Sequence, residues 1–133
     1  MTPSPQLDGV SVAVQDMAAS MAFYRLCGLP VPADADAQPH VEVVLGGGFR
    51  IMFDDQSGIT SWDAGWAPPD RGGRLTLAFR CSSPAEVDEV HRAIVAAGHP
   101  EHLAPFDAFW GQRYASVLDP DGTAVDLYAT LPV

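Results

Sequence analysis

Apolar and small residues alternate at the start of the chain. Residues 7–14 read LDGVSVAV, so three valines fall on one side and three small residues on the other. A period of two predicts a strand with one buried face. Asp16 follows as a helix N-cap, and the pattern predicts a helix over residues 17–27 that ends at Gly28.

The same order of elements returns in the second half. The segment RLTLAFRC, residues 74–81, again alternates between large apolar residues and others. Residues 83–98 then carry the signals of a helix, because Ser83 and Glu86 have the spacing of a capping box and Pro84 suits the first helical position. A glycine closes this segment, as is common at helix C-termini.

Further strands follow each helix. HVEVVL, a triple-glycine turn and FRIMF complete the first half, and RYASVL, an Asp-Pro-Asp-Gly turn and TAVDLY complete the second. Sliding the sequence by 74 residues lays Met52 on Asp126, within two segments of the same pattern. The chain is therefore predicted to be an internal duplication of a βαβββ module.

This duplication predicts the domain organisation. We expect one domain, residues 1–133, with a first module over residues 7–54 and a second module over residues 74–130. Residues 55–73 are rich in glycine, proline and aspartate and are predicted to be a linker loop. The linker carries two tryptophans, whose large rings need a surface to pack against.

Composition narrows the function classes. The chain has 133 residues, 47% of them apolar, and a net charge of -10, which disfavours nucleic-acid binding. The N-terminus has no signal-peptide pattern and no segment is apolar enough to cross a membrane, so we expect a cytoplasmic protein without a membrane partner. Cys27 and Cys81 form no metal or disulfide motif and are expected to be small buried residues.

Two segments together resemble the vicinal oxygen chelate superfamily, which includes glyoxalase I, extradiol dioxygenases, and bleomycin-resistance and fosfomycin-resistance proteins. They are the opening strand-Asp-helix with Phe23-Tyr24 and the ending FWGQRYASVLDPDGTAVDLYA. The resemblance covers nearly the whole chain. It implies an α+β fold in which two βαβββ modules form a half-open, cup-shaped mixed sheet with helices outside, and it implies a homodimer.

The resemblance also implies four metal-ligand positions, which fall on Gly9, Met52, Arg74 and Asp126 in this sequence. Of these, only Asp126 carries a group that binds divalent metals, whereas even an open catalytic site needs about three protein ligands. We therefore expect no metal cofactor. We further expect Arg74 to face Asp126 across the strand ladder, with Arg50 arriving from the other module.

A metal-free binding protein similar to the bleomycin-resistance branch is the first functional hypothesis. Its cup would take up a small drug-like molecule or metabolite and keep it from its target. The acidic chain favours a cationic ligand and the arginines an anionic one, so the charge stays open. The predicted ligand-binding residues face the cup or are aromatic residues near it: Arg50, Met52, Arg74, Thr76, Asp126, Tyr128, Trp62, Trp66, Trp110 and Tyr114.

Two other functions stay open. The first is an enzyme of the glyoxalase or extradiol dioxygenase type, a lyase or oxidoreductase with a divalent metal on non-standard ligands; Asp126 is then the candidate general base, although pairing with arginine would suit an anchor better. The second is an interaction module whose cup the Arg74 to Asp126 pair closes. The histidines are expected at the surface, and His40 beside Glu42 is the strongest exception.

Overall fold

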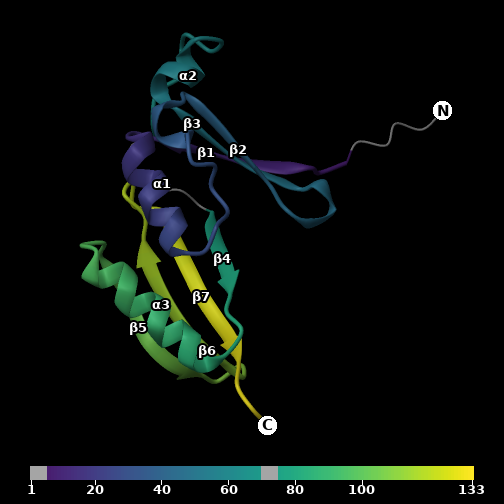
Figure 1. Ribbon diagram of the computed structural model, residues 1–133, viewed down its shortest axis with the longest axis vertical. Helices are drawn as coiled ribbons and strands as arrows, with labels where there is room; N and C mark the ends of the chain where they lie inside the picture. Colours follow the sequence, from purple (N-terminus) through teal and green to yellow (C-terminus); the bar gives the residue numbers. More distant parts are fainter. Residues whose placement is uncertain (1–5, 70–74) are drawn as a thin grey trace, which may run out of the picture.

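The computed structural model describes residues 6–69 and 75–133 and contains two mixed sheets (Figure 1). In the first sheet, the strand order is β1-β3-β2, with β1 parallel and β2 antiparallel to β3. The elements of this half are β1 (Gly9–Val14), α1 (Met17–Leu26), a 3₁₀ turn (Ala35–Ala37), β2 (His40–Val44), a second 3₁₀ turn (Gly46–Gly48), β3 (Arg50–Asp55) and α2 (Gln56–Thr60).

The second sheet has the order β4-β7-β6-β5, with β4 parallel to β7 and the other pairs antiparallel. One helix, α3, lies across one face of this sheet (Figure 1). The elements are β4 (Thr76–Arg80), α3 (Pro84–Ala96), β5 (Glu101–Ala108), β6 (Gln112–Leu118) and β7 (Ala124–Thr130). The α+β class and the mixed sheets with helices outside are thereby confirmed.

Both long helices begin at the predicted caps. The Asp16 carboxylate accepts a hydrogen bond from the Ala19 N–H at 3.1 Å, and the Ser83 hydroxyl accepts one from the Glu86 N–H at 3.1 Å. The Glu86 carboxylate completes the second cap differently from a capping box, because it accepts from the Ser82 backbone and hydroxyl. The side chains of Asp16 and Ser83 thus each satisfy one N–H group in the first turn of their helix.

The buried residues form a single core that extends through both modules. The inward side chains of β3 and β7 alternate with exposed or half-buried ones, as the sequence predicts. Helix α1 lies at the junction, since the ring centroid of Tyr24 is 4.9 Å from that of Phe53 in β3 and 6.5 Å from that of Phe79 in β4. Packing against both sheets explains why this helix buries so much of its surface.

The two segments that carry the family resemblance contact one another. The Tyr24 hydroxyl donates to the Asp119 carboxylate at 2.7 Å, and Asp121 accepts from the Gln15 N–H at 3.1 Å. Asp119 is only 2% exposed, and it also accepts from the N–H groups of Asp121 and Thr123. Burial, together with the Asp119 charge, raises the pKa of Tyr24 far above its usual range, so this hydroxyl remains a donor. We call these contacts the inter-module clamp.

Three local expectations are corrected. The predicted linker loop begins with α2, because the Asp55 side chain caps it by accepting from the Gly58 N–H at 2.7 Å. The segment between α3 and the expected strand RYASVL, for which no strand was named, forms β5 and places His102 in a strand. His91 is buried, at 7% exposure, because it lies one helical turn after Val87 on the inward side of α3. The triple glycine does form the predicted hairpin turn between β2 and β3.

Candidate functional site

Each sheet has one side turned away from the core, which we call its open face. On the N-terminal open face, Arg50 Nη1 donates to Glu42 Oε1 at 2.6 Å, and Arg50 Nη2 lies 3.5 Å from Asp8 Oδ2. His40 lies between two carboxylates, with Nε2 2.8 Å from Glu42 and Nδ1 2.6 Å from Asp54. The charged groups of this face therefore satisfy one another in a continuous network.

The protonation of this network follows from its contacts. Hydrogen bonds to Glu42 and Asp54 raise the pKa of His40, because both ring nitrogens then face carboxylates. The same contact with His40, together with that of Arg50, lowers the pKa of Glu42. Both shifts favour the charged forms, so the face presents a network of paired ions rather than a group free to exchange protons with a substrate.

The C-terminal open face is mainly aromatic. Arg80, Tyr128, Tyr114 and Phe106 are successive Cα partners on β4, β7, β6 and β5, so they form one row across all four strands. Side chains in such a row are direct neighbours. Trp110, which follows β5, extends the row, because its ring centroid lies 5.2 Å from that of Tyr114.

Asp126 lies in the next row of the same face. Its Cα partners are Ala78 and Ser116, and its carboxylate accepts a short hydrogen bond from the Tyr114 hydroxyl. Burial and this carboxylate raise the pKa of Tyr114 to about 12, so the phenol keeps its proton. Asp126 is half-buried, and both of its Cα partners are small residues.

The predicted arrangement of arginines around Asp126 is not observed. Arg74 lies outside the described residues, but the strand register places Ala78 opposite Asp126, four positions further along the chain. Arg50 bonds to Glu42 and Asp8 in the other sheet instead. The prediction was wrong because it assumed a different register between the first and last strands of each module. In the parallel pairing that forms, Ser11 lies opposite Met52 and Ala78 lies opposite Asp126.

The positions that the resemblance assigns to metal ligands do not fit a metal ion. Gly9 has no donor, and a Cβ placed there would lie 3.0 Å from the Arg50 carbonyl oxygen and 3.1 Å from the Met52 methyl group. Methionine therefore fills the space beside β1. Within residues 6–69 and 75–133, no three His, Cys, Asp or Glu side chains converge in a way that could hold a metal ion.

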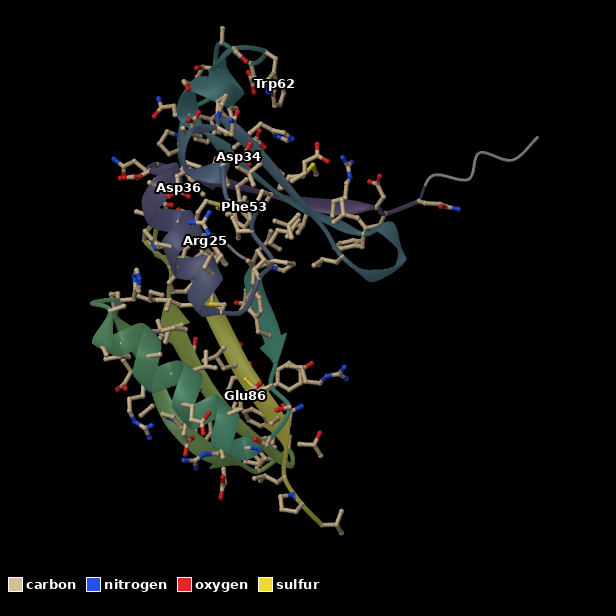
Figure 2. All side chains as sticks on the ribbon, in the orientation of Figure 1. Arg25, Asp34, Asp36, Phe53, Trp62 and Glu86 are labelled. Atoms are coloured by element: carbon tan, nitrogen blue, oxygen red, sulfur yellow. The ribbon has the colours of Figure 1, made fainter. Side chains whose placement is uncertain are left out.

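The candidate ligand residues do not form one group. Thr76, Tyr114, Asp126 and Tyr128 share the C-terminal open face, where Trp110 adjoins them. Arg50 and Met52 belong to the N-terminal open face. Trp62, which is 75% exposed, lies beside α2 at the end of the molecule opposite Glu86 and the C-terminal sheet (Figure 2), and Trp66 follows it in the chain.

Sequence reasoning missed three contributors to these faces. Arg80 and Phe106 complete the aromatic row, and Asp54 joins the ionic network through His40 and the Ser11 hydroxyl, which donates to it at 2.8 Å. Arg80 continues the alternation of Thr76 and Ala78, so that signal was present in the sequence. The position of Phe106 was not, since β5 carries register irregularities against β6.

Two hollows lie elsewhere on the surface. One of about 440 Å³ lies between α3 and the neighbouring strands and is lined by residues such as His91, Arg92 and Arg113. The other, of about 630 Å³, is lined by Asp16, Asp55 and their neighbours at the start of α1. Neither contains a predicted ligand residue. The open faces are surfaces that this single chain leaves accessible, and Trp110 is 48% exposed.

The sequence pattern of the Glyoxalase/Bleomycin resistance protein/Dioxygenase superfamily matches residues 6–127. The chain belongs to this superfamily. The superfamily includes glyoxalases and dioxygenases as well as resistance proteins, so membership defines the fold and leaves the activity open. Among curated proteins, no sequence matches the chain.

Several solved structures share this fold. A glyoxalase/bleomycin resistance protein/dioxygenase family enzyme from Burkholderia phytofirmans PsJN has a TM-score of 0.79 at 20% identity, covering 96% of this chain and 100% of that one. A glyoxalase-related enzyme from Fulvimarina pelagi has a TM-score of 0.77 at 22% identity, with 94% and 88% covered. A protein of unknown function from Agrobacterium tumefaciens str. C58 is 25% identical, with a TM-score of 0.71 and 98% of each chain covered.

One further property concerns membranes. None of the helices in residues 6–69 and 75–133 has the length and apolar character needed to span a bilayer.

Proposed function

We propose that this superfamily member binds a small organic molecule without a metal ion and, like the bleomycin-resistance branch, withholds it from its target. The observation that carries the proposal is that the positions where relatives hold metal ligands carry residues that cannot form such a set. Gly9 and Met52 offer no hard ligand, and Asp126 shares its carboxylate with a tyrosine hydroxyl.

The C-terminal open face is the proposed binding surface. Ligand sites combine apolar and aromatic area with a few placed polar groups, and this face has both. The row of Tyr128, Tyr114 and Phe106 supplies the area, Trp110 extends it, and Asp126 supplies the polar group. Thr76 in β4 remains a proposed contact, as does Arg74, which lies outside the described residues.

A homodimer is part of the proposal. Large aromatic side chains are exposed on the single chain, with Phe109 at 98% and Trp62 at 75%, and a second copy would cover part of this surface. Arg50, Met52 and Trp66 of the partner copy would then be proposed contacts across the interface. Light scattering after gel filtration tests the oligomeric state directly, and a monomer at micromolar concentration would contradict it.

The main test is a thermal-shift screen with metal analysis of the same sample. A ligand at 100 times its dissociation constant should add about 2.7 kcal/mol to the free energy of unfolding and raise Tm. We expect hits that persist after treatment with a chelator. If every hit disappears with the chelator and returns with a transition metal, the metal-free proposal is wrong.

An enzyme of the glyoxalase or dioxygenase type is the second candidate, favoured by the family membership and by the description of two structural relatives as enzymes. In that case a divalent metal would be held by non-standard ligands that include Asp126. The same metal analysis separates the candidates: a stoichiometric transition ion that is lost in Asp126→Ala would support the enzyme and contradict the binding protein.

A further inference from the structure

The two open faces differ in whether their charges are already paired. On the N-terminal face, the Arg50 guanidinium is held by Glu42 at 2.6 Å and by Asp8 at 3.5 Å, and His40 is held by Glu42 and Asp54. An anionic ligand would have to compete with these carboxylates for Arg50. The described residues of this face therefore include no cation that is ready to bind an anion.

Among the described residues, Asp126 on the C-terminal open face has no such counter-ion. Its strand neighbours Ala78 and Ser116 carry no charge, and the Tyr114 hydroxyl is its hydrogen-bond donor. Within the described part of the chain, no Lys, Arg or His nitrogen lies within ion-pair distance of its carboxylate. A half-buried carboxylate without a cation is costly, and a cationic ligand would offset that cost.

Aromatic surface adjoins this carboxylate. The Tyr114 ring lies 5.2 Å from Trp110 and 6.1 Å from Phe106, measured between centroids, with interplanar angles of 80° and 67°. The faces of tryptophan and tyrosine attract cations through their negative π-clouds. A ligand can thus place a charged group near Asp126 and lay a flat ring against Trp110.

Long-range charge acts in the same direction. The chain carries a net charge of -10, which draws cations to its surface and repels anions. Arg80 lies in the same row as Tyr114, but it is exposed at β4, the edge strand, where water screens its charge. Because Arg80 is a cation, the competing ligand class is an aromatic anion, and the test below includes one.

Building on the function proposed above, we infer that the ligand class is an aromatic organic cation, with its ammonium group at Asp126 and its ring against Trp110 and Tyr114. This assigns a charge to the ligand, which the sequence left open. It also assigns separate roles to the two kinds of side chain: Asp126 selects charge, and Trp110 binds the ring whatever its substituent.

Three indoles that differ in charge test the inference on the intact chain by calorimetry. Tryptamine is a cation, tryptophol is neutral and indole-3-propionate is an anion. We expect tryptamine to bind about tenfold more tightly than tryptophol and indole-3-propionate to bind most weakly. Added sodium chloride should weaken tryptamine binding and leave tryptophol binding unchanged.

Two variants separate the roles. Asp126→Asn keeps the size of the side chain, and it should abolish the tenfold preference for tryptamine over tryptophol. Trp110→Ala should weaken tryptamine and tryptophol binding by the same factor. Asp107→Asn is the matched control, because Asp107 pairs with Arg113 on the opposite side of the same sheet and should change none of the three affinities.

The outcomes distinguish this inference from the proposed function. If indole-3-propionate binds best, or if Asp126→Asn leaves tryptamine binding unchanged, the charge assignment is wrong although a ligand-binding surface remains. If none of the three binds the folded chain at millimolar concentration, both the charge assignment and the proposed binding surface are overturned.

Discussion

The two open faces occupy the same strand positions and use them in opposite ways. His40 is paired with Asp54 in the first sheet, and 74 residues later Tyr114 is paired with Tyr128 in the second. An ion pair in one module corresponds to an aromatic pair in the other. The first face satisfies its own charges, whereas the second exposes aromatic rings beside a carboxylate that no described cation neutralises.

The inward sides of the same strands did not diverge in this way. Ile51 and Phe53 correspond to Val125 and Leu127, and all four are buried. A packed core tolerates changes between hydrophobic residues of similar size, but it excludes charges that have no partner. The core positions of the two modules are therefore alike in chemistry, whereas the open faces, where water solvates both ionic and aromatic side chains, differ.

The largest expected effect comes from removing a buried contact between the two modules. Asp119→Ala removes the buried acceptor of the inter-module clamp and leaves the Tyr24 hydroxyl unpaired inside the core. We expect a loss of about 3 kcal/mol in the free energy of unfolding, measured by urea denaturation. Asp107→Asn, an exposed carboxylate in β5, should cost less than about 1 kcal/mol. Equal losses for the two variants would mean that the clamp stabilises the fold no more than an exposed ion pair does.

A smaller effect should distinguish the two aromatic regions. Trp110→Ala is expected to lower ligand affinity about tenfold, because it removes ring surface beside Tyr114. Trp62 lies at the end of the molecule away from the C-terminal sheet, so Trp62→Ala should leave ligand affinity unchanged in a monomer. A large loss for Trp62→Ala would show that the partner copy brings α2 to the site, and titration calorimetry measures both.

The smallest effect concerns the ionic face and depends on pH. The pKa of His40 is raised, so its pairing stabilises the fold fully below its unfolded pKa of about 6.5, and that stabilisation is lost as pH rises through the higher folded pKa. The pKa of Glu42 is lowered, so its contribution is lost as the solution becomes acidic. His40→Gln should therefore destabilise the chain most between about pH 5 and 6.5, by well under about 1 kcal/mol.

Urea denaturation at pH 5.5 and at pH 8.5 checks this window. The control is His102→Gln, at an exposed position of β5 with no ion-pair partner among the described residues. Its effect on unfolding should be the same at both values. A His40→Gln penalty that grows toward alkaline pH would contradict the charge assignment of the network.

Local signals predicted what is locally determined. The caps at Asp16 and Ser83, the hairpin turns and the alternation that turns Asp126 away from the core were all readable, since each depends on residues close in sequence. The 74-residue offset between segments of the same pattern predicted two similar modules. These features determine the fold class without any knowledge of long-range contacts.

The site depended on long-range contacts that no local pattern specifies. Which residue lies opposite Asp126 is decided by the register of two parallel strands separated by a helix and two further strands, so the sequence suggested Arg74 where the structure has Ala78. Similarly, Arg50 satisfies its charge within its own module, because Glu42 and Asp8 come close only when β2, β3 and β1 assemble. The buried position of His91 depends on the packing of α3 against the sheet.

The inter-module clamp has a consequence for how the chain could be rearranged. Tyr24 and Gln15 hold the hairpin of Asp119 and Asp121 without using the peptide that joins the halves. The two modules should therefore reassociate when supplied as separate polypeptides, and their order in the gene could be reversed. A split version of this protein, with one module on each fragment, would report its own reassembly through ligand binding.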